Sequence, residues 1–197
     1  MLLRSHQHKK MPWKNGGGIT YEIDRQPDNS GEDFHWRLAM AEIKYPGGPF
    51  SIFPNIDRTL SIIDGHRLKL TLNNQQSIEI DRNSPPFSFQ GETPIESEIF
   101  EDTVTDLNVM TRRDQCKHDF EKVVVKKNQD TIQISNDQNQ QILYVIIAQG
   151  DLQIGDINIT KGDVIKLTDY QQSITLFNFL NTETIIFLIK IITSLSV

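Results

Sequence analysis

The sequence predicts an all-β protein, and three observations support that prediction. Short runs rich in Ile, Val, Leu, Thr and Phe recur throughout, and turn-forming clusters such as YPGGP (45–49) and DRNSPP (81–86) separate them. Even, short spacing of this kind is typical of β-sandwiches and barrels. No strong helical pattern runs through the chain, and two segments in different halves resemble each other.

The clearest strand candidates are apolar or alternating runs: WRLAMAEI (36–43), RTLSIID (58–64), RLKLTL (67–72) and QILYVIIA (141–148). Shorter runs of the same character, DLQIGD, DVIKL, ITLFNFL and TIIFLIKI, supply further strands in the second half of the chain. One short helix is expected near residues 97–110. Everything else is expected to be strand or turn.

The two similar segments are LSIIDGHRLKLTLNNQQSIEI (60–80) and YVIIAQGDLQIGDINITKGDVIKL (144–167). Each begins with an apolar strand, turns at a glycine and continues with further strands. Gly65 and Gly150 hold equivalent places, 85 residues apart (150 − 65). A repeat of this length fits a duplicated double-stranded β-helix, in which each copy is a jelly-roll barrel. We expect one compact domain over 1–197, with halves at about 11–115 and 116–197.

Composition excludes several classes of partner. The net charge is −6, with 26 acidic against 20 basic residues, which argues against nucleic acid as a partner. The first residues lack the apolar core of a signal peptide, and no run reaches a spanning length, so we expect no membrane partner and a cytoplasmic location. The single cysteine, Cys116, fits a reducing compartment, and its charged neighbours predict a solvated loop position rather than a catalytic thiol.

Metal ligands are sparse in the sequence. The segment around Gly150 resembles a cupin core, and cupins usually hold a metal through a histidine pair, a glutamate and a later histidine. Neither half carries that pattern: His66 has no paired histidine, and the one HxH, His6 and His8, lies in a polar N-terminal stretch. Catalytic signatures such as GxSxG, HExxH and CxxC are also missing from the sequence. We therefore expect no metal, no cofactor and no catalytic residue set.

Four ordered motifs resemble the HutD/Ves family of bacterial cupin-like proteins. They are PWKNGGGITYEI (12–23), WRLAMAEI (36–43), GPFSIFPNIDRTLSIIDG (48–65) and FQGETPIESEIFEDTVTDLNVMTRR (89–113), of which DLNVMTRR is the most specific. Glu92 stands where family members more often have Asp. The resemblance implies a metal-free bicupin of RmlC-like jelly rolls in the bacterial cytoplasm. Members named HutD are linked to histidine utilisation, where sensing of an intermediate such as formylglutamate has been proposed, and members named Ves to stress or cold response.

The glycine-rich stretch near the start of the chain is the first candidate for a ligand site. Lys14 and Asn15 offer an ammonium and an amide, and Gly16 and Gly17 can expose successive backbone N–H groups. A concave nest of such amides binds carboxylate or phosphate oxygens. The alternative is that the glycines only shape a turn and that Lys14 is solvated.

Three further polar residues complete this candidate site on the strands that follow. Thr20 and Glu22 alternate and share one face of their strand. Arg58 stands just before a strong apolar run, and a guanidinium suits bidentate recognition of a carboxylate. Its partner is either a ligand or one of the carboxylates of Asp57, Asp106 and Glu42. Arg37, on another strand, fits a structural ion pair better.

The TDLNVMTRR motif supplies the remaining candidates. Asp106 and Asn108 alternate with apolar residues, so the two polar side chains share one face. If that strand lines the barrel, they form a pocket floor; if it is a loop, they satisfy backbone groups. Trp13, Phe53 and Phe89 are candidates for an apolar wall, although large aromatics in a β protein are core residues by default.

Three functions remain open. The first, which we expect, is metal-free binding of a small acidic metabolite in a sensing or regulatory role, without catalysis. The second is a metal-free cupin enzyme, an isomerase or hydrolase, in which Glu22 or Asp106 is the general base. The third is a pure interaction protein in which an exposed sheet edge mediates formation of a homodimer.

Overall fold

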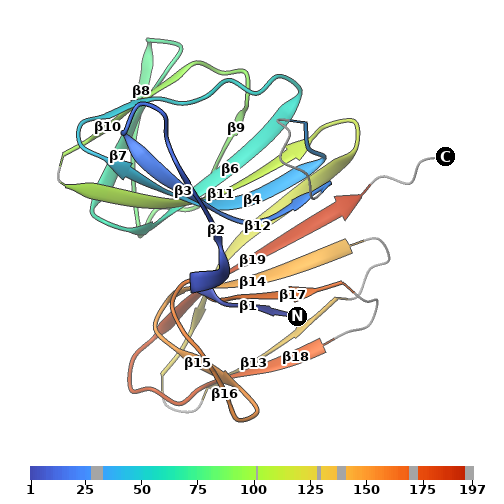
Figure 1. Cartoon of the computed structure of the whole chain (residues 1–197). Coiled ribbons are helices and arrows are strands. Elements are labelled where there is room, and N and C mark those ends of the chain that lie inside the picture. The colour runs from blue at the N-terminus through green and yellow to red at the C-terminus, as the bar shows by residue number, and fades with distance from the viewer. Residues whose placement is uncertain (28–32, 101, 128–129, 137–140, 169–172, 194–197) are drawn as a thin grey trace. The chain divides into compact units, whose positions relative to one another are not determined.

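The computed structural model describes residues 1–27, 33–100, 102–127, 130–136, 141–168 and 173–193 (Figure 1). These residues form strands and one single-turn 3-10 helix, Ser5–Gln7, so the all-β prediction is confirmed. The chain divides into two compact units. Residues 9–116 make up the N-terminal unit, and residues 1–8 join 117–197 in the C-terminal unit.

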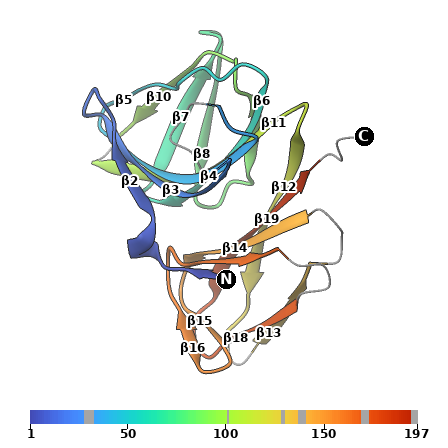
Figure 2. The same cartoon turned by 45° about the vertical axis from the view of Figure 1, so that its right-hand side comes forward.

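The N-terminal unit consists of two sheets, and their strand pairs are antiparallel among the described residues. The six-stranded sheet has the order β2 (Lys9–Pro12), β3 (Gly18–Gln26), β4 (Trp36–Lys44), β11 (Thr103–Arg112), β6 (Ile56–Asp64) and β9 (Phe87–Gln90). The four-stranded sheet has the order β5 (Gly47–Pro49), β10 (Ile95–Ile99), β7 (Arg67–Leu72) and β8 (Gln76–Asp81). Figure 2 shows the curvature of the larger sheet through β2, β3 and β4.

One apolar cluster joins the two sheets of the N-terminal unit. Leu60 and Ile62 of β6 pack with Leu68 and Leu70 of β7, and all four side chains are buried. Their alternation along each strand places the apolar side chains on one face, as period-two patterning requires. Burial of a side chain of this size stabilises the fold by roughly 1.5–3 kcal/mol. This core occupies one end of the space between the sheets.

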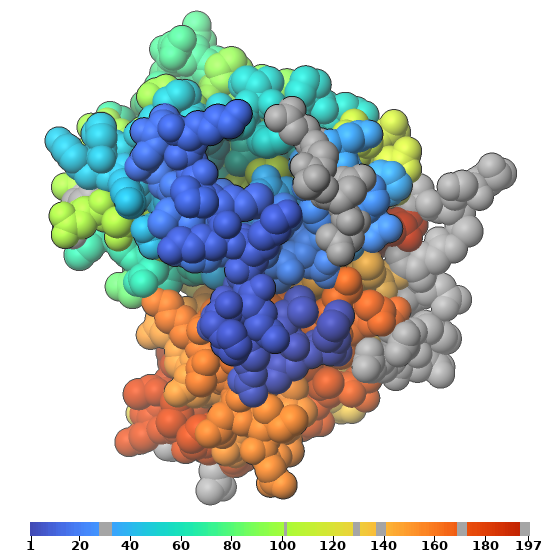
Figure 3. Space-filling model, viewed as in Figure 1, coloured from blue at the N-terminus to red at the C-terminus, as the bar shows by residue number. Residues whose placement is uncertain are grey.

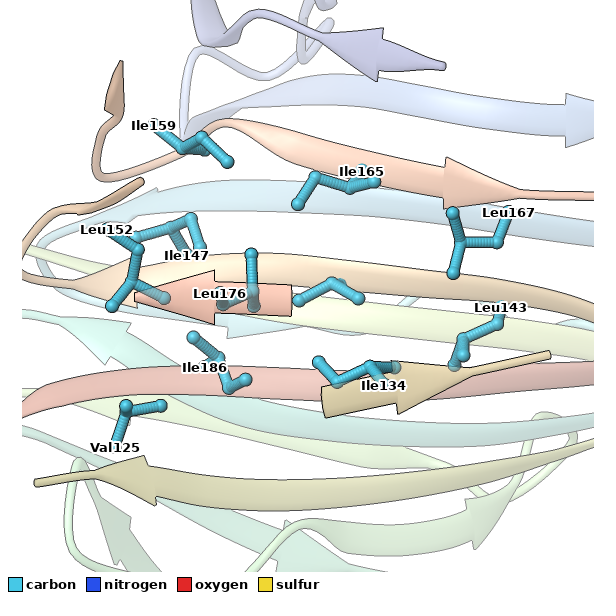
Figure 4. Packing of buried hydrophobic residues seen from close by; sticks show 11 residues of the cluster. Val125, Ile134, Leu143, Ile147, Leu152, Ile159, Ile165, Leu167, Leu176 and Ile186 are labelled. Carbon is cyan, nitrogen blue, oxygen red and sulfur yellow. The ribbon is translucent and has the colours of Figure 1, made fainter. Parts of the chain in front are cut away.

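The C-terminal unit repeats the plan of two sheets. One has the order β1 (Leu2–Leu3), β17 (Val164–Leu167), β14 (Gln141–Gln149), β19 (Thr184–Thr193) and β12 (Cys116–Val125). The other has the order β13 (Asp130–Ser135), β18 (Ser173–Asn178), β15 (Leu152–Ile154) and β16 (Ile157–Ile159). Eleven buried Ile, Leu and Val residues fill the space between them (Figure 4). The cluster between these two sheets is therefore apolar, and Asn136, Gln141 and Asn178 are buried polar residues elsewhere in the described part of this unit.

The first eight residues of the chain belong to the C-terminal unit. Leu2 and Leu3 pair with Ile165 and Val164, and the space-filling view shows this N-terminal segment lying against the orange β17 region (Figure 3). Asp163 holds the segment in place: one carboxylate oxygen accepts from Arg4 Nη1 at 2.7 Å and the other from the Ser5 backbone N–H at 2.9 Å. The first strand of the chain, β1, thus belongs to the same sheet as its last strand, β19.

The two units contain equivalent glycines and strands, as the sequence repeat predicts. Gly65 follows β6 with φ +84°, and Gly150 follows β14 with φ +79°. Each glycine packs against the strand that pairs with its own: a Cβ on Gly65 would lie 2.6 Å from the Thr103 carbonyl oxygen of β11, and one on Gly150 would lie 2.6 Å from Thr184 Oγ1 of β19. The equivalence of β6 with β14, and of β11 with β19, follows.

Two expectations were wrong. Residues 97–110 form no helix, because they are the end of β10 and most of β11. β11 lies between β4 and β6 and is buried on both faces, so its Asp106 and Asn108 lie inside the unit. These two polar residues interrupt the apolar run, which obscures the strand pattern in the sequence. Cys116 is not a solvated loop residue: it begins β12, is 3% exposed, and its thiol donates to the His35 carbonyl oxygen.

We predict that Gly65→Ala destabilises the protein more than Gly16→Ala. Both glycines have positive φ (+84° and +74°), so both substitutions incur the left-handed backbone cost of about 1–2 kcal/mol. Only Gly65 adds a steric conflict, because the space around a Cβ on Gly16 is open. Urea unfolding should show a further loss of about 1–3 kcal/mol for Gly65→Ala. Equal losses for the two variants would contradict the close approach of Gly65 to β11.

Candidate ligand-binding site

The N-terminal unit contains a cavity of about 390 Å³ over the inner face of its six-stranded sheet. Eight of the residues that the sequence singled out for a ligand site line it: Trp13, Lys14, Asn15, Thr20, Phe53, Arg58, Asp106 and Asn108. They come from the β2–β3 turn, β3, the segment before β6, β6 and β11, which are distant in sequence. The sheet brings them together through strand register.

The cavity exists because β4 contributes small side chains at the centre of the sheet. Ala41 lies opposite Asp106, and Ala39 lies opposite Asn108, in the pairing of β4 with β11. All four residues line the cavity. An alanine projects only a methyl group from the sheet, so the space above these two positions stays open. The alternation Leu–Ala–Met–Ala in the sequence of β4 therefore leaves room for the cavity.

Arg58 is buried in the wall of the cavity, with 6% of its surface exposed. Its guanidinium carbon lies 5.2, 5.6 and 4.8 Å from the ring centroids of three phenylalanines, Phe50, Phe53 and Phe89. Its Nη1 atom donates to the Ser51 carbonyl oxygen at 3.3 Å, and Nε has no partner among the described residues. Burial lowers the pKa of Arg58 to about 10, so the side chain is still a cation at neutral pH.

Asp106 lies in the cavity floor and is 1% exposed. Burial raises the pKa of its carboxyl to about 7, against the opposing effects of the Arg58 charge and a hydrogen bond from the Ala41 backbone. No ion pair within 4.0 Å joins it to Arg58 in the described structure, and its Oδ1 atom has no hydrogen-bond partner there. A carboxyl of this kind exchanges its proton near neutral pH.

Asn108 adds a second unsatisfied polar atom to the floor. It is 4% exposed, and its Oδ1 atom lacks a partner within the described part of the chain. Buried polar atoms are nearly always hydrogen-bonded, and leaving one unpaired costs about 1–3 kcal/mol. Three such atoms from Arg58, Asp106 and Asn108 belong to residues around one cavity. Their arrangement suits a polar guest that supplies the missing hydrogen bonds.

The glycine-rich stretch forms the turn between β2 and β3. Gly16 N–H donates to the Trp13 carbonyl oxygen at 3.0 Å, and Gly17 N–H donates to Asn15 Oδ1 at 3.0 Å. The expectation that Gly16 and Gly17 expose an amide nest was wrong, because both N–H groups are used inside the turn and neither glycine lines the cavity. Lys14 and Asn15 do line the cavity, so the turn contributes side chains to the cavity rather than backbone N–H groups.

Trp13 is fixed at the cavity by two contacts. Its indole Nε1 donates to Thr20 Oγ1 at 2.9 Å, which joins the turn to β3. Gly18 lies beneath the ring, where an added Cβ would lie 3.0 Å from the indole and closer still to the Glu42 carbonyl oxygen. The third glycine of the stretch is therefore the one that allows close packing.

Glu22 was expected in the site, but the structure places it elsewhere. Its carboxylate accepts from Arg37 Nε at 2.6 Å and lies 3.8 Å from Arg25 Nη1. It lines an adjoining hollow rather than the cavity itself. Because two arginines hold Glu22, it is a poor general base, and the enzyme hypothesis loses one of its two candidates. The ion pair expected of Arg37 is present, and Arg37 also lines the cavity.

The sequence analysis missed several lining residues. Phe50 and Ser51 come from the segment before β6, and Ala39 and Ala41 carried no chemical signal by themselves. The GPFSIFPNIDR motif contains Phe50 and Ser51. Residue spacing alone, however, does not predict that this loop covers the guanidinium of Arg58. Arg58 and Asp57 also differ in role. Asp57 accepts from Arg113 Nε at 2.6 Å and does not pair with Arg58.

Arg113 joins two of the sequence motifs outside the cavity. Besides Asp57, it binds both carboxylate oxygens of Glu92, at 2.7 and 2.8 Å. The hydrogen bonds with Arg113 lower the pKa of Glu92. The glutamate at position 92 thus makes a bidentate contact between the FQGET and TRR segments.

The described residues contain no group of three or more His, Cys, Asp or Glu side chains that is placed to hold a metal ion. No helix in that part of the chain is long and apolar enough to span a membrane. Burial raises the pKa of the Cys116 thiol to about 11, so this group is protonated at neutral pH.

We predict that Asp106→Asn stabilises the protein more at pH 8 than at pH 5. The folded carboxyl keeps its proton up to about pH 7, whereas the unfolded carboxyl ionises near 3.8. The folded state therefore binds more protons between these values, and the free energy of unfolding falls as the pH rises through this window. Asn cannot ionise, so the variant should gain a few kcal/mol at pH 8 in urea unfolding. Exposed Asp102→Asn is the control, and an Asp106→Asn effect that is equal at both pH values would contradict the burial of a neutral carboxyl.

Comparison with known proteins identifies the family. The HutD family model matches residues 5–186. The Ves protein of Citrobacter koseri is 38% identical over 113 residues, and the match spans 55% of this chain and only 58% of that relative. The HutD structure from Pseudomonas fluorescens has a TM-score of 0.79 at 22% identity, and the PA5104 structure from Pseudomonas aeruginosa has 0.81 at 19%. Each alignment covers 98% of both chains, so the cupin jelly-roll fold is shared throughout. The chain therefore belongs to the HutD family.

Proposed function

We propose that the cavity of the N-terminal unit binds a small carboxylic acid metabolite, and that the protein serves as a sensor or regulator. The observation that carries this proposal is the buried Arg58 guanidinium. It faces a cavity with an unpartnered Nε and has no carboxylate within 4.0 Å among the described residues. A buried cation without an anionic partner is costly, and a bound carboxylate would supply that partner.

The charge balance of the cavity supports an anionic guest. Arg58, Arg37 and Lys14 contribute positive charge to its lining. Against them stands Asp106, whose pKa of about 7 leaves it partly neutral, while the Glu22 carboxylate is engaged by Arg37. The protein as a whole carries −6, so the positive charge at the cavity runs against the overall charge of the chain. Such a focused field attracts small anions.

The size and walls of the cavity indicate what else the ligand contains. About 390 Å³ suits a small metabolite rather than a polymer. Trp13, Phe50 and Phe53 form apolar surface beside the polar floor. We infer a compact molecule with one carboxylate at Arg58 and an aliphatic or planar remainder against the rings.

Family membership suggests which acids to test first. The resemblance to HutD links the family to histidine utilisation, in which formylglutamate is a carboxylate of suitable size. Formate belongs in the panel because the HutD structure from P. fluorescens is of a formate condition. Urocanate, histidine, glutamate, glutarate and several sugar acids complete the panel. The regulated pathway follows from the acid that binds.

The test is a thermal-shift screen of the purified protein against this panel. A ligand at a hundred times its Kd stabilises by about 2.7 kcal/mol, which is a shift of roughly 5–11 °C for a chain of this length. Arg58→Met removes the charge and keeps an apolar side chain among the rings, so it should abolish the shift. Arg67→Met is the matched control, because Arg67 also lies over a phenylalanine, at 4.5 Å from the Phe100 ring, but outside the cavity. Shifts that survive Arg58→Met would contradict the proposal.

Asp106 supports a second candidate, a metal-free acid–base enzyme. A carboxyl whose pKa lies near 7 inside a cavity has the property of a general acid or base. Turnover of any acid that binds, followed by NMR, would support this candidate if Asp106→Asn abolishes turnover and leaves binding intact. Binding without turnover would favour the sensor.

A further inference from the structure

We infer that protonated Asp106 donates a hydrogen bond to the carboxylate that Arg58 binds, so that ligand binding takes up a proton. This inference rests on the proposed function and specifies how the same cavity recognises its ligand. Asp106 thereby sets specificity for an anion and makes its affinity depend on pH.

Strand register places Asp106 and Arg58 at opposite ends of one polar row. Arg58 of β6 lies opposite Met110 of β11, and Asp106 is four residues before Met110 on the same face. Four strand residues span about 13 Å, and the Arg58 side chain covers only part of that distance. Asn108 lies midway, on the same face. The gap over Asn108 is where a carboxylate fits between the two groups.

The unsatisfied atoms match the two oxygens of a carboxylate. Arg58 Nε is a buried donor without a partner in the described residues, and Asp106 Oδ1 has none either. The two side chains do not satisfy each other, since no ion pair within 4.0 Å links them there. A protonated Asp106 is a second donor. One ligand oxygen then accepts from Arg58 and the other from Asp106, which converts both unpaired groups into charge-assisted hydrogen bonds.

Charge repulsion fixes the sign of the effect. An ionised Asp106 repels an incoming carboxylate in a site of low dielectric, whereas the neutral acid attracts it. The other charged groups at the cavity are Arg58 from β6, Arg37 from β4 and Lys14 from the β2–β3 turn, and Glu22 of β3 reaches it only through Arg37. The Arg58 charge favours ionisation of Asp106 when the site is empty. A bound carboxylate offsets that charge and raises the pKa of Asp106 further above its ligand-free value of about 7.

The experiment is calorimetric titration of the full-length protein with N-formylglutamate and with glutarate, whose carboxyl groups are almost fully ionised by about pH 6.5. Affinity should be highest near about pH 6.5 and fall up to tenfold per pH unit above about 7. Titration at pH 7.5 in two buffers of different ionisation enthalpy should show uptake of up to one proton per ligand. This measurement needs no variant.

Two variants assign the proton to Asp106. Asp106→Asn keeps a neutral donor and should bind both acids with an affinity that no longer changes between pH 6 and 8.5. Glu92→Gln is the control, because Glu92 pairs with Arg113 outside the cavity, and it should retain the wild-type pH profile.

The other outcomes are equally informative. Binding that is independent of pH, or that strengthens as the pH rises, would overturn the inference and leave the proposed function standing. Strengthening would mean that an ionised Asp106 accepts from a donor on the ligand. If neither acid nor any member of the screening panel binds at any pH, the proposed function fails, and the inference fails with it.

Discussion

The buried charge of Arg58 is the constraint on which the rest of the site depends. A guanidinium withdrawn from water must recover its lost solvation, and no carboxylate within 4.0 Å does so among the described residues. Three aromatic rings and one backbone carbonyl oxygen compensate for part of the lost solvation of the guanidinium. Cation–π contacts and a single long hydrogen bond are weaker than an ion pair. The fold therefore holds a cation whose best partner is a guest molecule.

The duplication provides an internal comparison that supports this view. The 85-residue offset places Leu143 of β14 at the position of Arg58, and strand register places Ile186 of β19 at that of Asp106. Leu188, likewise, corresponds to Asn108. The polar floor of one unit is thus an apolar core in the other (Figure 4). The same architecture is stable when filled with apolar side chains, so the polar floor and open cavity of the N-terminal unit are not requirements of the fold.

Much of the fold was readable from the sequence, because strand spacing and the repeated glycine are local signals. The site could be predicted where polar residues interrupt apolar strands. Arg58, Asp106 and Asn108 each stand at an inward-facing strand position, where an apolar residue is expected. Glu22 was misassigned because face alternation does not reveal that a neighbouring strand supplies Arg37 as its partner. The glycine turn was misread because whether its amides are free depends on hydrogen bonds within the turn.

The most direct test of the central claim is an NMR measurement on the Arg58 side chain. In ¹⁵N-labelled protein, buried arginine Nε–Hε groups exchange slowly with water, and substitution assigns the Arg58 and Arg67 signals. Titration with glutarate should shift the Arg58 Nε–Hε resonance and leave that of Arg67 unchanged, because Arg58 lines the cavity and Arg67 does not. A saturating shift of the Arg58 signal, with the Arg67 signal unchanged, would establish the carboxylate site. An unchanged Arg58 signal, in the presence of binding seen by calorimetry, would place the ligand elsewhere and contradict the account.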